Sequence, residues 1–244
     1  MSGSTDCDEC PLRRHAGFQS NSPAELAFIQ EFRERERSIG AGMPILREGD
    51  TSDRLFTLRA GWAFRHRTLP DGRRQILNFL LPGDFIGLQS EISGRSPHGV
   101  EALTSVRLCE FSRDGLWELY RRFPSLGYDI TWLASHEEWI VDENLLTTGR
   151  RSAMERVAMI LVHLARRAES VGEGGSEGIV FPLTQQHLAD ALGLSLVHTN
   201  KTLRRLQALG LHEMAGGRLR LRDPRALQRI AEYYAQPLKS RPLI

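Results

Sequence analysis

Residues 183–210 read LTQQHLADALGLSLVHTNKTLRRLQALG, a stretch that predicts two short helices joined by a tight turn. Thr184 is placed to cap the first helix, and Gly193 ends it, as glycine does in a left-handed C-terminal position. Ser195 can then cap a second helix. The apolar side of the first helix consists of Leu188, Ala189 and Leu192. Two short helices around a glycine turn are typical of a helix-turn-helix motif.

The second helix predicts a surface that reads DNA. Three apolar residues are expected to face the first helix: Val197, Leu203 and Leu206. The remaining side chains are expected near its outer face: Leu196, His198, Thr199, Lys201 and Thr202, with Arg204 and Arg205 behind them. A recognition helix places its N-terminal residues against base edges and its basic residues near phosphates. We therefore predict that these outer-face residues bind DNA, together with Thr184, Gln185 and Ser195 at the starts of the two helices.

Residues 210–223, GLHEMAGGRLRLRD, predict a Gly-Gly turn between two short strands. Arg218, Arg220 and Arg222 alternate along the second strand, where they could reach the DNA backbone. This hairpin is typical of the wing that follows a helix-turn-helix. Each of the three elements is a weak signal alone, but their order favours a winged helix-turn-helix.

The distribution of charge supports a nucleic-acid partner. Residues 1–150 carry 18 Arg and Lys against 22 Asp and Glu, whereas residues 151–244 carry 14 against 8. An acidic N-terminal part and a basic C-terminal part indicate two domains, of which the second has a polyanionic partner. No apolar run approaches the roughly 20 residues that span a bilayer, and the polar start is not a signal peptide. Three cysteines form no disulfide framework, so we expect a cytoplasmic protein without a membrane partner.

The N-terminal half predicts a β-sandwich or barrel. Residues 38–112 contain short strand-like runs separated by turn glycines. A short helix capped by Ser22 is expected before them. In the run VEALTSVRLCEF, the residues expected to point inward are Val100, Ala102, Val106, Leu108 and Phe111. With the helical C-terminal half, this predicts an α+β protein.

A long helix is predicted over residues 125–149. Its apolar residues recur at helical spacing: Ile130, Leu133, Ile140, Val141 and Leu145. Glu137 and Asn144 interrupt this stripe, which favours pairing with a second copy over burial in a core, although a plain linker helix is the alternative. Ser152 and Glu155 form a capping box for the next helix. The predicted domains are a tail (1–20), a sensor domain (21–124), a dimerisation helix (125–150) and a DNA-binding domain (151–244).

The chain resembles the Crp/Fnr superfamily of bacterial transcription regulators. The resemblance rests on GWAFRHRTLPDGRRQILNFLLPGDFIGL, on ALTSVRLCEF and on LTQQHLADALGLSLVHTNKTLRRL, in matching order over about residues 20–225. It implies a β-roll (a cyclic-nucleotide-binding-like jelly roll), a dimerisation helix and a winged helix-turn-helix. A homodimer would then bind a two-fold symmetric operator with half-sites roughly 34 Å apart. It would act through RNA polymerase, more often as an activator; Asp71 lies in the turn where relatives touch polymerase, although a surface hairpin is the simpler interpretation.

Two departures from the family pattern affect ligand and operator. Members that bind cyclic AMP carry a Gly-Glu pair and an Arg-Ser pair, where this chain has Gly87-Leu88 and Pro97-His98. Without the carboxylate and the arginine, cyclic AMP binding is not expected, so we expect a different signal.

The recognition helix also departs from the family pattern. Fnr- and FixK-like members read a base with a glutamate and place an arginine four residues later. Val197 and Lys201 stand there, which puts the usual half-site in doubt; His198 or Asn200 could contribute instead.

The three cysteines leave several interpretations open. Oxygen-sensing Fnr proteins hold a 4Fe-4S cluster with three N-terminal cysteines and one in the β-roll. Cys7, Cys10 and Cys109 match three of these positions, but Ala16 stands at the fourth, with His15 beside it. A 4Fe-4S cluster that responds to oxygen, a thiol redox switch, or no role beyond tail and core are the alternatives.

Two other classes of function compete with a DNA-binding regulator. One is a small-ligand or cyclic-nucleotide binding module without selective DNA binding. The other is a thiol oxidoreductase using Cys7 and Cys10, but no βαβ pattern surrounds that pair. No other motif of a hydrolase, metalloprotease or phosphate-binding loop occurs, so we expect no enzyme.

Overall fold

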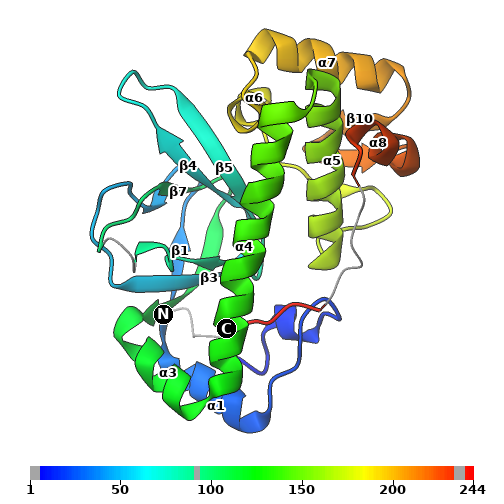
Figure 1. The fold of residues 1–244 in the computed structure, drawn as a ribbon. Helices are drawn as coiled ribbons and strands as arrows, with labels where there is room; N and C mark the ends of the chain where they lie inside the picture. The colour runs from blue at the N-terminus through cyan, green and yellow to red at the C-terminus, as the bar shows by residue number, and fades with distance from the viewer. Residues whose placement is uncertain (1–5, 91–93, 234–239) are drawn as a thin grey trace. The chain divides into compact units, whose positions relative to one another are not determined.

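A computed structural model describes residues 6–90, 94–233 and 240–244 of the chain (Figure 1). The chain divides into two compact units. The first comprises residues 1–67, 79–138 and 239–244, and the second comprises residues 68–78 and 139–238. Strands and helices both contribute, which confirms the predicted α+β class.

Two antiparallel four-stranded sheets form the β-roll. One has the order β1 (Arg33–Ile39), β8 (Val106–Ser112), β3 (Arg54–Ala60) and β6 (Phe85–Ile86). The other has the order β2 (Pro44–Leu46), β7 (Gly99–Ala102), β4 (Ala63–Thr68) and β5 (Arg74–Leu80). Alternate residues of both sheets meet in one apolar cluster. The residues predicted to point inward are all buried there or beside it: Val100, Ala102, Val106, Leu108 and Phe111.

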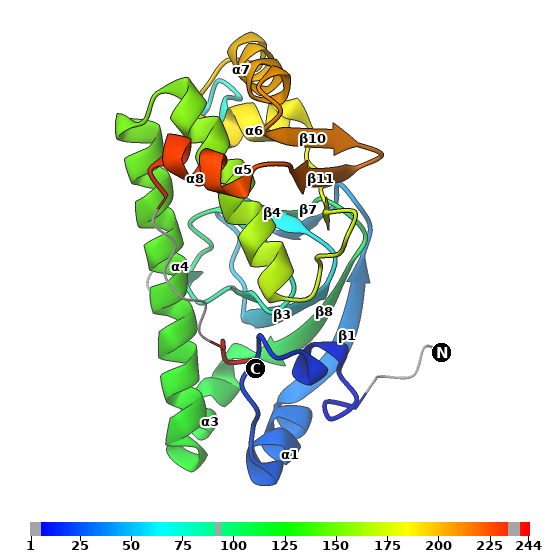
Figure 2. The same ribbon diagram turned by 90° about the vertical axis from the view of Figure 1, so that its right-hand side faces the viewer.

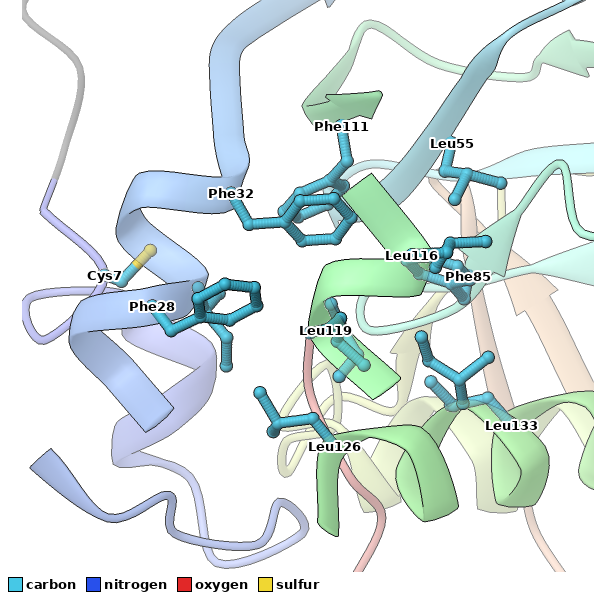
Figure 3. Packing of buried hydrophobic residues seen from close by; sticks show 13 residues of the cluster. Cys7, Phe28, Phe32, Leu55, Phe85, Phe111, Leu116, Leu119, Leu126 and Leu133 are labelled. Carbon is cyan, nitrogen blue, oxygen red and sulfur yellow. The ribbon is translucent and has the colours of Figure 1, made fainter. Parts of the chain in front are cut away.

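Within the described residues of the first unit, helices pack on the sheet and bury a second apolar cluster (Figure 3). They are α1 (Pro23–Phe32), α3 (Leu116–Arg122), which follows the 3-10 turn η2 (Arg113–Gly115), and the first half of α4 (Pro124–Arg150). Ser22 caps α1 as predicted, because its hydroxyl accepts from the Glu25 N–H while the Glu25 carboxylate accepts from the Ser22 N–H. Phe32 and Phe111 pack with ring centroids 4.9 Å apart, joining α1 to the sheet.

The apolar stripe of α4 is largely used within one copy of the chain, contrary to the prediction. Ile130, Leu133 and Ile140 are at most 5% exposed, whereas Leu145 is 69% exposed and Val141 is half-buried. The polar interruptions also have partners inside the chain, which explains them without a second copy. Glu137 forms an ion pair with Arg65 of β4 (3.0 Å) in the first unit. In the second unit, the Asn144 side chain donates to the backbone oxygen of Leu77 (2.8 Å).

The second unit packs the second half of α4 and further helices with a three-stranded sheet of order β10-β11-β9. Strands β10 and β11 lie side by side in Figure 2. The further helices are α5 (Ala153–Ser170), α6 (Gln185–Leu192), α7 (Leu196–Ala208) and α8 (Pro224–Ala231). The strands are β9 (Ile179–Val180), β10 (His212–Ala215) and β11 (Arg218–Leu221). The predicted capping box of Ser152 and Glu155 starts α5. The buried face of α5 includes Val157, Ile160, Leu161 and Leu164, which are at most 3% exposed.

The two ends of the chain differ from the predicted domain limits. Residues 11–14 form the 3-10 turn η1 (Pro11–Arg14), and Cys7 is buried against α1, so this part of the predicted tail is packed. Residues 240–244 pack on the first unit rather than on the second unit. The tip of the β4–β5 hairpin, residues 68–78, groups in turn with the second unit.

Candidate nucleic-acid interface

The predicted helix-turn-helix is present with its expected caps. The Thr184 hydroxyl accepts from the His187 N–H (3.2 Å) at the start of α6. Gly193 ends α6 with φ 61°, a left-handed conformation that disfavours other residues. The Ser195 hydroxyl accepts from the His198 N–H (3.2 Å) and starts α7. Sequence reasoning located both helices because their ends depend on local chemistry.

The buried face of α7 differs from the prediction. Thr199 (0% exposed) and Thr202 (7%) face the protein interior with Leu203 and Leu206, whereas Val197 is 79% exposed. The spacing explains this, because positions 199, 202, 203 and 206 share one side of a helix. Both threonine hydroxyls donate a hydrogen bond to a backbone oxygen of the preceding turn. The acceptor of Thr199 is Ser195 O (3.0 Å), and that of Thr202 is His198 O (2.9 Å). Thr199 therefore supports α7 from the interior, and Thr202 is largely buried but borders the hollow on the exposed face.

The exposed face of α7 carries the positive charge. A hollow on this face is lined by Ser195, Val197, His198, Lys201, Thr202 and Arg205. Lys201, Arg204 and Arg205 are exposed, and Leu196 is 45% exposed. The Asn200 side chain donates to the Gln185 side-chain oxygen (2.6 Å), which joins the start of α6 to α7. The arrangement therefore offers three cations and a partly apolar N-terminal turn to one ligand surface.

The hairpin of β10 and β11 has the predicted Gly-Gly turn, with both glycines at positive φ. Its arginines are less available than predicted. Arg218 is half-buried and donates to Gly178 O (3.1 Å), so it ties β11 to the loop before β9. Arg220 donates to Ser176 O, and Arg222 pairs with Glu213 across the strands. Each of these arginines thus has a partner within the unit, and Arg220 and Arg222 remain exposed.

Sequence reasoning missed the contacts that hold α6. The Arg74 guanidinium donates through Nε (3.0 Å) and forms an ion pair through its terminal nitrogen (2.9 Å) with one carboxylate oxygen of Asp190. The Gln75 side chain donates to Ala191 O (3.0 Å), and Arg156 donates to Leu192 O (2.9 Å). Arg74 and Asp190 are 116 positions apart, so no local pattern could have indicated the pair.

The three cysteines meet in one small cavity of the first unit. Cys7, Cys10 and Cys109 line it, and its volume is about 20 Å³. Burial raises the pKa of the Cys7 thiol. Burial also raises the pKa of Cys109 to about 11, against the opposing charge of Arg33. Both thiols are therefore protonated at neutral pH and react slowly as nucleophiles.

A 4Fe-4S cluster does not fit this arrangement. Such a cluster takes four ligands, whereas the cavity offers three thiols and room for about one water molecule. Ala16 supplies no ligand, and His15 already accepts the Gly17 N–H on Nδ1 (3.1 Å). Among the residues that the structure describes, no group of three His, Cys, Asp or Glu side chains is arranged to hold a metal ion.

The positions that clamp cyclic AMP in relatives have other environments here. Leu88 packs against the apolar cluster of the first unit. His98 is 5% exposed, and burial, with the charge of Arg65, lowers its pKa to about 3. The imidazole is therefore neutral and offers no charge to a phosphate.

Comparisons with known proteins cover both units. Residues 36–123 match the family described as Cyclic nucleotide-binding domain, and residues 155–230 match the Crp-like helix-turn-helix domain. The nitrogen fixation regulation protein FixK of Bradyrhizobium diazoefficiens is 31% identical, covering 92% of this chain and 93% of that protein. The transcriptional activator protein FnrL of Cereibacter sphaeroides is 31% identical over 87% and 86% of the two chains.

Solved structures agree with this assignment. The structure of FixK2 from Bradyrhizobium japonicum has a TM-score of 0.73 and 27% identity, covering 82% of this chain and 98% of that one. Within the described parts of this chain, no helix combines the length and apolar character needed to cross a membrane. Two matched domains in family order and a relative of this identity over nearly the whole chain show the relationship. The chain belongs to the Crp/Fnr family of DNA-binding transcription regulators.

Proposed function

We propose that the chain acts as a homodimer in the cytoplasm, binds a two-fold symmetric DNA operator and activates transcription through RNA polymerase. One observation carries the proposal: α7 packs its threonine and leucine face inward and presents exposed Lys201, Arg204 and Arg205 outward. Relatives named as transcriptional activators, FnrL and AadR of Rhodopseudomonas palustris, support activation. The exposed Asp71 turn of the β4–β5 hairpin is the proposed polymerase contact.

The proposed DNA contacts divide by chemistry. Lys201, Arg204 and Arg205 neutralise phosphates or reach guanine, and the exposed caps Thr184 and Ser195 with Gln185 donate to the backbone. Leu196, Val197 and His198 stand at the N-terminal turn of α7, where base edges are read. Val197 accepts no hydrogen bond from a base amine but can contact a thymine methyl group. Arg218 contributes only after leaving Gly178 O, and Thr199 and Thr202 position the helix.

Dimerisation is proposed through the part of α4 that the chain leaves uncovered. Leu145 and Leu146 are 69% and 48% exposed, next to half-buried Val141. Exposed apolar residues grouped on a helix favour an interface. Ile130, Leu133 and Ile140 support the helix from inside a single copy. The signal is proposed to differ from cyclic AMP, because Leu88 stands at the carboxylate position, and Pro97 and neutral His98 stand where the arginine and serine would fall.

The proposal is tested by fluorescence anisotropy, which measures binding to selected operators between 50 and 200 mM salt. Over this range, the rising salt concentration lowers the affinity of a protein with several phosphate contacts by a factor of about 10³–10⁵. Lys201→Ala should lower affinity and reduce the salt slope by about one. Arg14→Ala, an exposed arginine of the first unit, is the matched control and should change neither. Equal affinity of the wild type for all sequences would refute operator-specific binding.

A further inference from the structure

Residues 240–244, Ser-Arg-Pro-Leu-Ile, are held by the first unit as a peptide would be. Phe18 and Arg241 form a parallel β-bridge. The Gln19 N–H donates to Arg241 O (2.8 Å), and the Arg241 N–H donates to Gly17 O (2.8 Å). Main-chain pairing of this kind is how an extended segment adds to an existing strand.

The side chain of Arg241 enters a site built to receive it. Its guanidinium donates to Asp84 (2.8 Å) and to Gly83 O (3.0 Å), and it lies 5.9 Å from the centre of the Phe18 ring. Arg241 is 7% exposed and Asp84 is 2% exposed. Gly83 has φ 91°, and a Cβ there would lie 2.4 Å from the Phe18 ring, so only glycine allows this packing.

The last two residues close the cavity that holds the cysteines. Leu243 and Ile244 are each 3% exposed, and both line the cavity with Cys7 and Cys109. The Thr57 hydroxyl donates to Ile244 O (2.7 Å). Arg13, another residue of the lining, donates to Leu243 O (3.2 Å). The segment is thus fixed by main chain, charge and apolar burial at once.

We propose that residues 240–244 are an intramolecular peptide ligand of the first unit and form a removable wall of the cysteine cavity. Because the cavity has room for about one water molecule, a larger group on Cys7 or Cys109 must displace Leu243 or Ile244. Docking of the segment and occupation of the cavity therefore oppose each other, and the coupling is reciprocal.

The test measures thiol accessibility and so does not depend on the proposed function. Full-length protein is treated with N-ethylmaleimide, and alkylation of Cys7 and Cys109 is followed by peptide mass spectrometry. Arg241→Ala, which leaves Asp84 buried without its cation, should accelerate alkylation at least about tenfold. Removal of residues 240–244 should do the same. The control Arg225→Ala, an exposed arginine on α8, should react as the wild type does.

Two further measurements keep the proposal falsifiable if a variant folds poorly. The acetylated peptide Ser-Arg-Pro-Leu-Ile, added to the shortened protein, should restore slow alkylation, and the same peptide with alanine for arginine should not. Alkylated wild-type protein should lose hydrogen-exchange protection at the Arg241 amide. Alkylation rates that are equal in wild type and Arg241→Ala, or unchanged protection after alkylation, would overturn the proposal.

Discussion

Replacing Arg74 by methionine should loosen the attachment of α6 to the β4–β5 hairpin by about 1–2 kcal/mol. Hydrogen bonds to charged groups contribute about 1.5–3 kcal/mol each, and Arg74 makes two such contacts with Asp190. The side chains keep 24% and 13% of their exposure, so water screens part of this energy. Gln186 still donates to the other Asp190 oxygen (2.6 Å) in the variant, which limits the loss further.

A double-mutant cycle isolates the pair. Arg74→Met, Asp190→Asn and the double variant are compared by hydrogen exchange of the α6 amides, which reports the free energy of local opening. The coupling energy should be about 1–2 kcal/mol. The control cycle uses Arg73 and Asp71, an exposed pair (77% and 52%) of the same chemistry, and should give about 0–0.5 kcal/mol. Equal coupling in the two cycles would refute the assignment of Arg74 as the residue that holds α6.

Three further outcomes follow from the structure. Val197→Glu should gain hydrogen-bond acceptors facing base amines and change operator preference by about 1–3 kcal/mol at one base pair, measured by anisotropy on paired operators; unchanged preference would remove Val197 from the base-reading surface. Leu145→Asp should weaken self-association in analytical ultracentrifugation without lowering the stability of the single copy, because Leu145 is 69% exposed. His98 has a pKa of about 3 when folded against about 6.5 when unfolded, so the unfolded chain binds the extra proton in that window. The free energy of unfolding should therefore fall by about 1.4 kcal/mol for each pH unit between pH 6 and 4. In denaturant titrations, His98→Asn should remove this contribution to the slope. The contribution of His212, whose pKa is also lowered, should be the same in both proteins.

Local chemistry explains why the helix ends could be predicted and one helix face could not. Ser22, Ser152, Thr184 and Ser195 each accept from an N–H three residues later, a contact written into adjacent sequence. The face of α7 was assigned from hydrophobicity, which placed Val197 inside and Thr199 outside. Threonine enters the interior because its hydroxyl bonds to the preceding turn, and helical spacing alone would have grouped it with Leu203 and Leu206.

Contacts between distant residues account for most of what the sequence could not show. Glu137 and Asn144 looked like interruptions of a pairing helix because their partners, Arg65 and Leu77, lie more than 60 positions earlier in the chain. Arg241 is likewise one of many basic residues in the C-terminal half of the sequence, and only the structure shows its ion pair with Asp84. Polar residues on an apolar stripe indicate that a partner exists, but only the fold identifies it.

The proposed DNA contacts account for the exposed apolar residues at the start of α7. Leu196 and Val197 expose apolar surface to water on a helix that is otherwise amphipathic. This exposure does not contribute to the stability of the fold. Lys201, four residues on, supplies charge on the same side, so the surface combines one cation with apolar groups rather than a carboxylate. Thymine methyl groups match the apolar part, and phosphate or guanine matches the lysine. The operator should accordingly present thymine where relatives with a glutamate read a base amine, and the half-site is expected to differ from theirs at that position.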